Sequence, residues 1–387
     1  MGNAARNFSG RFWALIGATF LGFLGIGTVL PQLGPHVRYD LGGSDQTVGL
    51  VIGVFSFVAL GARFFAGPLA DRRGRKIAFL TGLASCGLSG IAYLLPLGLA
   101  GPYLGRILQG LGEACLYTGA AIWAVECAGV ERGGQALGYV SSGIWGGISA
   151  GPMVGQWLGT FNRAAMFQSI GALVALAVVS RIREEYRPVP HEGKGHVLIR
   201  SLLTPGIAIG FVNVHYPVVA GFLVLHMARH GNSGPAVFSM YALTMLLSRF
   251  FLGSLPDRFP PSITYFGGIA LMAVGLIILA PGPNPAVAVL GGAILGFGFS
   301  FPWSSILSTV LRRTHPGTRG SSVGILSAFY DLFVGSSSFA AGAVANRFGY
   351  SAAFAMAALA LVGAAIGGRL VFFPRRADVL ASETAHV

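Results

Sequence analysis

Charged residues are scarce in this chain of 387 residues. Only 10% of the residues are charged, whereas 53% are hydrophobic. That leaves too little polar surface to cover a soluble globular protein of this size. The composition therefore excludes an ordinary soluble domain and indicates a membrane protein with several spans.

Cysteine is almost absent as well. Cys86, Cys115 and Cys127 stand singly within apolar segments, without a C-x-x-C pair or a nearby histidine at ligand spacing. We therefore expect buried thiols and neither a metal site nor a structural disulfide. The chain also lacks an H-E-x-x-H motif and a phosphate-binding P-loop. A membrane-embedded enzyme is thus only a remote alternative, and no cofactor is expected.

Long apolar runs are what the chain has in abundance. About 20 apolar residues in a helix cross the roughly 30 Å of hydrocarbon in a bilayer, and twelve runs are long enough. Their predicted limits are 11–35, 45–69, 75–96, 101–127, 134–160, 162–181, 200–228, 233–256, 261–281, 285–311, 320–346 and 349–373. We predict an all-α membrane protein with twelve transmembrane helices. The first run has no obvious small-residue cleavage site, so we expect a retained helix and no signal peptide.

An internal duplication divides the chain into two similar halves. The segment Arg63–Arg72, RFFAGPLADR, returns 186 residues later at Arg249–Arg258 as RFFLGSLPDR, with seven of ten positions identical. Tandem halves built from apolar helices are common in secondary transporters. The longest polar stretch lies between these halves. We therefore predict two pseudo-symmetric six-helix bundles, 1–181 and 200–387, joined by a cytoplasmic linker at 182–199.

The basic residues indicate the orientation in the membrane. With both termini in the cytoplasm, 18 of the 26 Lys and Arg residues lie in cytoplasmic segments. Four lie in outer loops (Arg38, Arg163, Arg229, Arg347) and four within helices (Arg63, Arg106, Arg249, Arg369). The positive-inside rule then predicts a multi-pass protein of the inner membrane with both termini cytoplasmic. Because topology accounts for the net charge of +13, we expect no nucleic-acid partner.

The loop after the second predicted helix carries a specific motif. Residues 67–76 read GPLADRRGRK, which resembles the loop between the second and third helices in the major facilitator superfamily. The resemblance implies a gating motif made of Gly67, Asp71, Arg72, Gly74, Arg75 and Lys76. In it, Asp71 would contact the positively polarised N-terminus of the eleventh helix, near Gly320–Ser322. A solvated turn that only enforces topology is the alternative.

We expect each residue of this loop to have a specific structural role. Gly67 would allow close approach of a neighbouring helix, Gly74 would permit the tight turn, and Arg75 and Lys76 would stay in water. The second copy departs from the motif, because Phe-Pro-Pro follows Asp257–Arg258. We therefore expect a weaker latch, or none, on that side.

Two further motifs extend the resemblance over the chain. Arg106–Gly112, RILQGLG, matches the motif of the fourth helix. Gly143 and the segment Gly151–Gly155, GPMVG, resemble the fifth-helix motif of the exporting antiporter branch. That likeness implies a glycine face (Gly143, Gly151, Gly155) packed against the eighth helix and a bend at Pro152. Leu104–Trp123 with residues 329–331 is similar to a subgroup that includes exporters of opine-type metallophores.

Acids at membrane depth are candidates for proton coupling. Glu113 and Asp331 are the acids placed well inside predicted helices. Burial in an apolar helix favours the protonated form of Glu113, whereas an ion pair with Arg106, seven residues earlier on the same face, is the alternative. We expect Asp331 to pair with Arg63 across the two halves. In the competing interpretation, each group is satisfied within its own half.

Three arginines and a few aromatic residues are candidates for a solute cavity. Arg63, Arg106 and Arg249 favour a carboxylate or another anionic group, and Arg249 is the best single candidate. The remaining cavity candidates are His215, Tyr117, Trp123 and Tyr330, for each of which structural packing is the alternative. Near the cytoplasmic end, we expect Glu126 to pair with the cations around Arg72 and Arg75.

These observations predict a secondary active transporter that works by alternating access. We expect proton-driven export of a small anionic or zwitterionic organic solute, and proton-coupled uptake is the alternative. The expected partners are the solute, protons and the lipid bilayer, and the chain is expected to act as a monomer.

Overall fold

The computed structural model describes residues 8–129, 132–184, 199–252, 259–314 and 319–373. Every regular element within these ranges is a helix, which confirms the predicted all-α class. The chain divides into two compact units, Met1–Pro190 and His191–Val387. The division falls within the predicted linker at 182–199, most of which lies outside the described residues.

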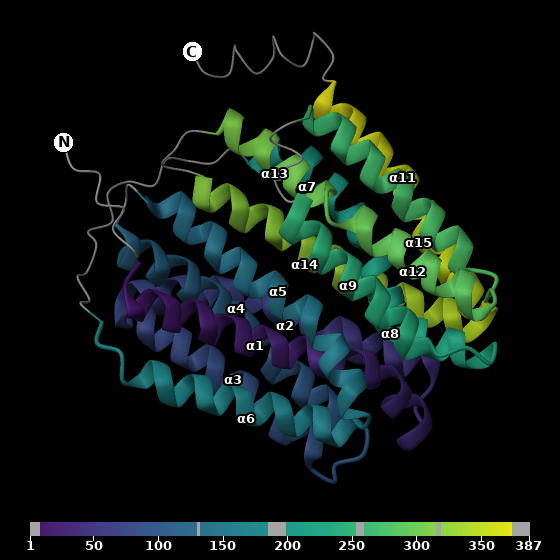
Figure 1. Cartoon of the computed structure of the whole chain (residues 1–387), viewed down its shortest axis with the longest axis horizontal. Coiled ribbons are helices and arrows are strands. Elements are labelled where there is room, and N and C mark those ends of the chain that lie inside the picture. Colours follow the sequence, from purple (N-terminus) through teal and green to yellow (C-terminus); the bar gives the residue numbers. More distant parts are fainter. Residues whose placement is uncertain (1–7, 130–131, 185–198, 253–258, 315–318, 374–387) are drawn as a thin grey trace. The chain divides into compact units, whose positions relative to one another are not determined.

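The first unit is a bundle of six long helices (Figure 1). They are α1 (Gly10–Pro35), α2 (Asp45–Arg73), α3 (Arg75–Leu94), α4 (Ala100–Ala128), α5 (Gly133–Leu158) and α6 (Phe161–Ser180), with a π-helical turn η1 (His36–Asp40) after α1. Side-chain caps fix some of the starts. The hydroxyl groups of Ser9 and Thr160 accept hydrogen bonds from the backbone N–H groups of Phe12 and Arg163, which satisfies donors that a helix start leaves open.

The second unit repeats this plan with two broken helices. Its described elements are α7 (Ile199–Asn213), α8 (His215–Arg229), α9 (Gly234–Leu252), α11 (Pro261–Leu279), α12 (Pro285–Phe299), α13 (Pro302–Arg313), α14 (Arg319–Phe348) and α15 (Tyr350–Phe372). Together, α7 and α8 occupy the predicted helix 200–228, and α12 and α13 occupy 285–311. The prediction of twelve long helical segments is thus confirmed.

Proline explains both breaks. Pro217 has no N–H group for the carbonyl of Asn213, and Pro302 has none for the carbonyl of Gly298. Each break lies within four residues before its proline, at Val214 and at Ser300–Phe301. The runs 200–228 and 285–311 were each predicted as one helix, although Pro217 and Pro302 are local signals of the two breaks.

Nine of the helical segments in the described ranges are long and apolar enough to cross a membrane. Helices α4, α5 and α9 are not among these nine. Helix α4 carries three charged residues, Arg106, Glu113 and Glu126, and α5 is rich in glycine and serine. Such residues in a transmembrane helix usually face neighbouring helices or a cavity, so α4 and α5 are where functional groups should be sought.

The helix contacts repeat between the two units. In the first unit α3 packs on α4 and α6, α2 packs on α4, and α1 packs on α5 and α6. In the second unit α11 packs on α12 and α15, α9 packs on α12, and α7 packs on α14 and α15. The same pairs of elements therefore meet in the same order, which is the pseudo-symmetry expected from the duplication.

Close contacts between glycines show which residues of the two units are equivalent. A Cβ atom on Gly112 would come within 3.0 Å of the Gly82 carbonyl oxygen, and one on Gly298 would come within 2.7 Å of that of Gly268. The second pair lies 186 residues after the first, the same offset that separates Arg63 from Arg249. This offset therefore relates equivalent positions of the third and fourth helices, as well as of the second.

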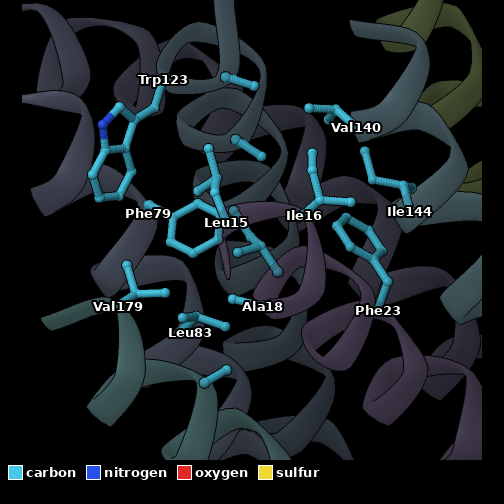
Figure 2. Packing of buried hydrophobic residues seen from close by; sticks show 14 of the residues in the cluster. Leu15, Ile16, Ala18, Phe23, Phe79, Leu83, Trp123, Val140, Ile144 and Val179 are labelled. Carbon is cyan, nitrogen blue, oxygen red and sulfur yellow. The ribbon is translucent and has the colours of Figure 1, made fainter. Parts of the chain in front are cut away.

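One hydrophobic cluster of the first unit lies among its helices (Figure 2). Phe79 and Trp123 meet there edge to face, with ring centroids 6.0 Å apart. Trp123 is buried among apolar side chains such as Leu15 and Leu83. Trp123 thus packs in this core, and the expectation that it lines a solute cavity stays a prediction.

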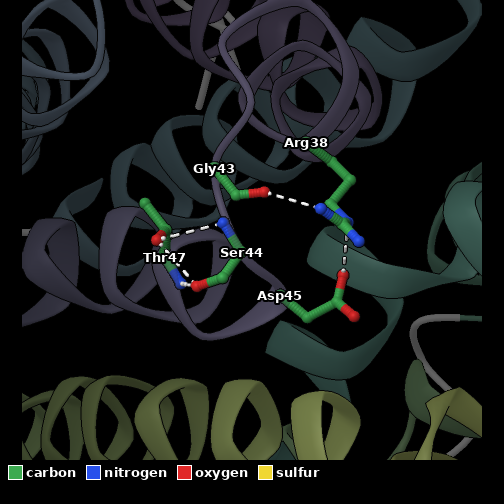
Figure 3. A network of polar contacts seen from close by, with 5 residues as sticks. All are labelled: Arg38, Gly43, Ser44, Asp45 and Thr47. Carbon is green, nitrogen blue, oxygen red and sulfur yellow. Dashed lines mark hydrogen bonds and ion pairs between the residues drawn. The ribbon is translucent and has the colours of Figure 1, made fainter.

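A polar network fixes the connection from α1 to α2 (Figure 3). Ser44 and Thr47 form a capping box at the start of α2, which satisfies two open backbone donors. Arg38 donates to the carbonyl of Gly43 at 3.0 Å and pairs with buried Asp45 at 3.2 Å. The chain reversal is therefore held by polar contacts at the end of α2 opposite the GPLADRRGRK loop.

Candidate functional site

Arg63 and Glu113 form an ion pair inside the first unit. Arg63 on α2 donates from Nη2 to both carboxylate oxygens of Glu113 on α4, each at 3.3 Å. The side chains are 17% and 13% exposed. The guanidinium group also lies 5.2 Å from the centre of the Tyr117 ring, within cation–π range. The pair is therefore mostly desolvated while still reachable by water.

This pair bears on two expectations from the sequence. The partner of Glu113 is Arg63 on another helix and not Arg106 on its own. Arg63, in turn, has an acid partner within its own unit, as in the interpretation that satisfies each group locally. Asp331 is buried on α14 of the second unit, so the expected pair between Arg63 and Asp331 stays a hypothesis.

Arg106 belongs to a buried network. Its guanidinium group donates to the backbone carbonyls of Val51 and Ile52 on α2, at 3.3 and 3.0 Å, and to Gln109 at 2.6 Å. Gln109 donates to Gln168 on α6 at 3.1 Å. Because Arg106 is only 4% exposed and a buried charge needs such partners, the geometry favours a role in joining helices over contact with a solute.

Arg249 occupies the repeat position of Arg63, but its surroundings differ. Its guanidinium carbon lies 5.7 Å from the centre of the Phe299 ring on α12. Phe299 follows Glu113 by the repeat offset of 186 residues. Tyr241 and Tyr330 lie within electrostatic reach of the guanidinium group. The position that holds a carboxylate in the first unit therefore holds an aromatic ring in the second.

His215 lies at the break between α7 and α8 and is fully buried. Its ring nitrogens lie 2.8 Å from the carbonyl oxygen of Val212 and 3.3 Å from the Tyr241 hydroxyl. Its ring packs against Phe299 at 4.5 Å. Tyr241 thus joins His215 to the neighbourhood of Arg249. Tyr330 is half-buried and meets Trp303, 6.2 Å away, edge to face.

The GPLADRRGRK loop is tied to the ends of two other helices. Gly74 has a φ of +106°, a backbone conformation that favours glycine. The backbone N–H of Arg75 donates to Glu184 at 2.7 Å, and its side chain pairs with Glu126 at 3.0 Å. The Arg75–Glu126 pair confirms the expected partner of Glu126. Since Gly74 lacks a side chain to cap α3, the Glu184 carboxylate fills that place.

Lys76 and Gly67 differ from their expectations. Lys76 donates to the carbonyls of Ser180 and Ile182, both at 2.7 Å, and so caps the end of α6. Arg75 and Lys76 therefore do not simply stay in water. A Cβ atom on Gly67 would meet nothing within 4 Å, so the described residues show no close helix approach there. Asp71 and Arg72 are exposed at the end of α2.

The orientation can be tested at the two ends of α2. Arg73 and Gln46 are both exposed and lie at opposite ends of this helix. In a chain without its three native cysteines, we expect a cysteine replacing Arg73 to react with an impermeant maleimide only after the membrane is opened. A cysteine replacing Gln46 should react in intact cells. The reverse pattern would overturn the predicted orientation.

The glycines of the fifth-helix motif face α1. A Cβ atom on Gly151 would lie 2.5 Å from the carbonyl carbon of Gly27, and one on Gly143 would lie 3.3 Å from the carbonyl oxygen of Ile16. Gln32 donates to the carbonyl of Gly155. The glycine face is thus occupied by α1. Its expected packing against the eighth predicted helix, 233–256, is therefore wrong. Helix α5 runs through Pro152.

No group of three His, Cys, Asp or Glu residues in the described part of the chain could hold a metal ion. The charged side chains described above are instead suited to ion pairing and to contact with an anion.

Glu184 was not predicted from the sequence as a partner of the GPLADRRGRK loop, because nothing in the linear sequence brings the end of α6 to the start of α3.

Comparisons with known proteins agree with this architecture. Residues 15–234 and 218–385 match the family model described as Major Facilitator Superfamily. An uncharacterized MFS-type transporter of Salmonella typhimurium is 28% identical over 365 residues, covering 90% of this chain and 93% of the relative. One from Burkholderia mallei is 28% identical over 387 residues, covering 96% and 94%.

Solved structures show the same fold. A mutant of the nucleoside transporter NupG superposes with a TM-score of 0.77 at 14% identity, covering 94% of this chain and 100% of that chain. The human organic anion transporter MFSD10 (TETRAN) superposes with a TM-score of 0.70 at 16% identity, covering 92% and 98%.

Proposed function

We propose that this chain, which belongs to the major facilitator superfamily, exports a small anionic or zwitterionic organic solute in exchange for protons. Membership makes it a membrane transporter of a small molecule. The direction, the coupling ion and the class of solute are our proposal. We also propose that the protein works by alternating access, is a monomer, and lies in the inner membrane with both termini in the cytoplasm.

The different neighbours of the two repeated arginines carry this proposal. Arg63 shares its site with a carboxylate that can bind a proton, whereas Arg249 lies beside the Phe299 ring, against which His215 also packs. We assign proton binding to the Arg63–Glu113 pair and anion binding to Arg249. Asp331 is kept as a second candidate for proton coupling. The human organic anion transporter has the same fold, which supports an anionic solute only by analogy.

The fifth-helix motif supports export, but the Arg63–Glu113 ion pair favours uptake. Protonation of Glu113 would remove the charge that holds Arg63, and Arg63 could then bind an anionic group. Proton and solute would in that case be bound together, as a symporter requires. Proton-coupled uptake is therefore the second candidate.

One experiment separates these directions. Metabolites inside and outside cells are first compared with and without the protein, and the leading anionic solutes are tested in proteoliposomes. Export by exchange predicts that solute leaves the compartment into which protons flow and collects on the opposite side. Symport predicts that solute and protons move together. Transport unaffected by an imposed pH gradient would contradict both.

Arg249→Lys is expected to weaken solute binding about ten- to 150-fold while the protein still assembles. Lysine keeps the charge but loses the planar fork that binds a carboxylate at two points, and the lost hydrogen bond to a charged group accounts for this range. The binding constant in purified protein is the measurement. Arg229→Lys, at the end of α8, is the matched control. Unchanged affinity in Arg249→Lys would make Arg249 a structural residue.

The latch assigned to Asp71 is also part of the proposal. Its carboxylate is exposed at the end of α2, and the side chains of Arg319 and Ser321, on either side of Gly320, lie outside the described ones. Residues Asp257 and Arg258 of the second copy lie outside them as well. The weaker latch expected in that copy therefore stays a prediction.

A further inference from the structure

A groove of about 620 Å³ lies between α11 and α15 in the second unit. It is lined by Phe266, Val362, Ala365, Ile366, Arg369 and Phe373. Val362, Ile366 and Phe373 are 55–62% exposed. Apolar side chains that line a groove on membrane-spanning helices match acyl chains and not water. The groove therefore suits a hydrocarbon chain, and Arg369 is the only charged residue in the described part of its lining.

More positive charge gathers at the same end of α15. A smaller hollow of about 280 Å³ is lined by Pro261, Ser262, Thr309, Arg312, Arg313 and Phe372. Arg313 donates to the carbonyl of Val371 at 3.2 Å. The ring of Phe372 lies 6.2 Å from that of Phe266, which lines the groove. The hollow and the groove are thus neighbours at the last turn of α15.

The helices that bear these two features are held firmly together. The Tyr265 hydroxyl donates to the carbonyl of Ala364 at 2.8 Å across the contact of α11 and α15. Tyr265 itself is fully buried. The groove is therefore formed in advance, and an occupant need not order its walls.

We propose that the groove and the hollow bind one anionic phospholipid of the cytoplasmic leaflet. One acyl chain occupies the groove, and the phosphate lies near Arg369 and Arg312. Among the described residues, neither lining includes an acidic one, so the charge complements an anionic headgroup. The positive end is the one predicted to be cytoplasmic, where basic pockets between helices recognise such lipids. A soluble anion would leave the adjoining apolar groove unused.

The test counts lipids bound to the purified full-length protein by native mass spectrometry. The probes are dioleoylphosphatidylglycerol and dioleoylphosphatidylcholine, which share acyl chains and differ in headgroup charge. Each cation near a membrane surface contributes about five-fold to anionic-lipid binding. We expect the double variant Arg369→Gln, Arg312→Gln to lose about 25-fold in affinity for the anionic lipid. Its affinity for phosphatidylcholine, whose choline cation offsets the charge of the same phosphate, should fall much less.

Two further variants separate the possible causes. Arg181→Gln removes an exposed cation just after α6, the helix equivalent to α15, and should bind the anionic lipid like the wild type. Ala365→Trp fills the groove but keeps all three arginines, and should weaken both lipids. Equal wild-type affinity for the two lipids, or equal losses in the double variant and Arg181→Gln, would overturn the proposal. Undiminished binding of the anionic lipid in Ala365→Trp would overturn it too, because the arginines alone would then suffice.

Discussion

Glu113→Gln is expected to abolish solute transport driven by a pH gradient while solute exchange without net proton movement survives. Glutamine keeps the shape of the side chain but carries neither a charge nor a titratable proton. Arg63 would then face a permanent mimic of protonated Glu113. Coupling between two ligands, here the proton and the solute, typically changes the affinity for one of them by up to about 100-fold. We therefore expect the rate of gradient-driven transport to fall by about that factor. Counterflow in proteoliposomes measures the exchange.

Two variants control for structural effects of that change. Glu126→Gln removes an acid from the same helix and breaks its pair with Arg75, but should leave coupling intact. Glu113→Asp keeps a titratable carboxyl group and should retain part of the gradient-driven transport. Both proteins should match wild type in amount and thermal stability. Full gradient-driven transport in Glu113→Gln would remove Glu113 from the coupling mechanism.

The variant Asp331→Asn tests the second candidate for proton coupling. If it helps to set the equilibrium between states, Asp331→Asn should reduce gradient-driven transport and counterflow together. If gradient-driven transport survives in Glu113→Gln and in Asp331→Asn alike, His215 or an ion other than the proton becomes the better candidate.

The helices were predictable because their limits depend on local chemistry. Apolar runs end at charged or glycine-containing turns, so the start of α3 after Gly74 could be placed to the residue. The break before α13 was also encoded locally, by Pro302, but an uninterrupted apolar run concealed it. Hydropathy measures the length of a segment and is insensitive to one missing hydrogen bond.

The candidate site was only partly predictable, because pairing depends on which helix faces meet. The charged residues themselves were visible as rare groups in apolar segments. The partner of Arg63 was not, since Glu113 lies 50 positions away and reaches it only through the packing of α2 on α4. For Arg106, Gln109 three residues later was a local signal of a buried network, whereas Gln168 on α6 was not.

Gly151→Ala is expected to destabilise the first unit strongly, because a backbone and not a flexible side chain fills the space beside Gly151. A Cβ atom there would lie 2.5 Å from the carbonyl carbon and 2.6 Å from the Cα atom of Gly27. Separating α1 from α5 to relieve this contact would loosen neighbouring packing as well. Overpacking of this kind typically costs about 1–3 kcal/mol, which lowers the melting temperature by about 2–12 °C for a unit of this size.

Gly138→Ala is the matched control for this change. Gly138 lies on the same helix, and a Cβ atom there would meet nothing within 4 Å, so the substitution should be neutral or slightly stabilising because alanine favours helix. Thermal unfolding of the purified proteins in one detergent measures both. If Gly151→Ala melts like Gly138→Ala yet transports poorly, then the glycine face acts in the transport cycle and not in holding α1 against α5. A lower melting temperature with normal transport per folded molecule would instead make the glycines of the fifth-helix motif packing residues, and the motif would lose its weight as support for export.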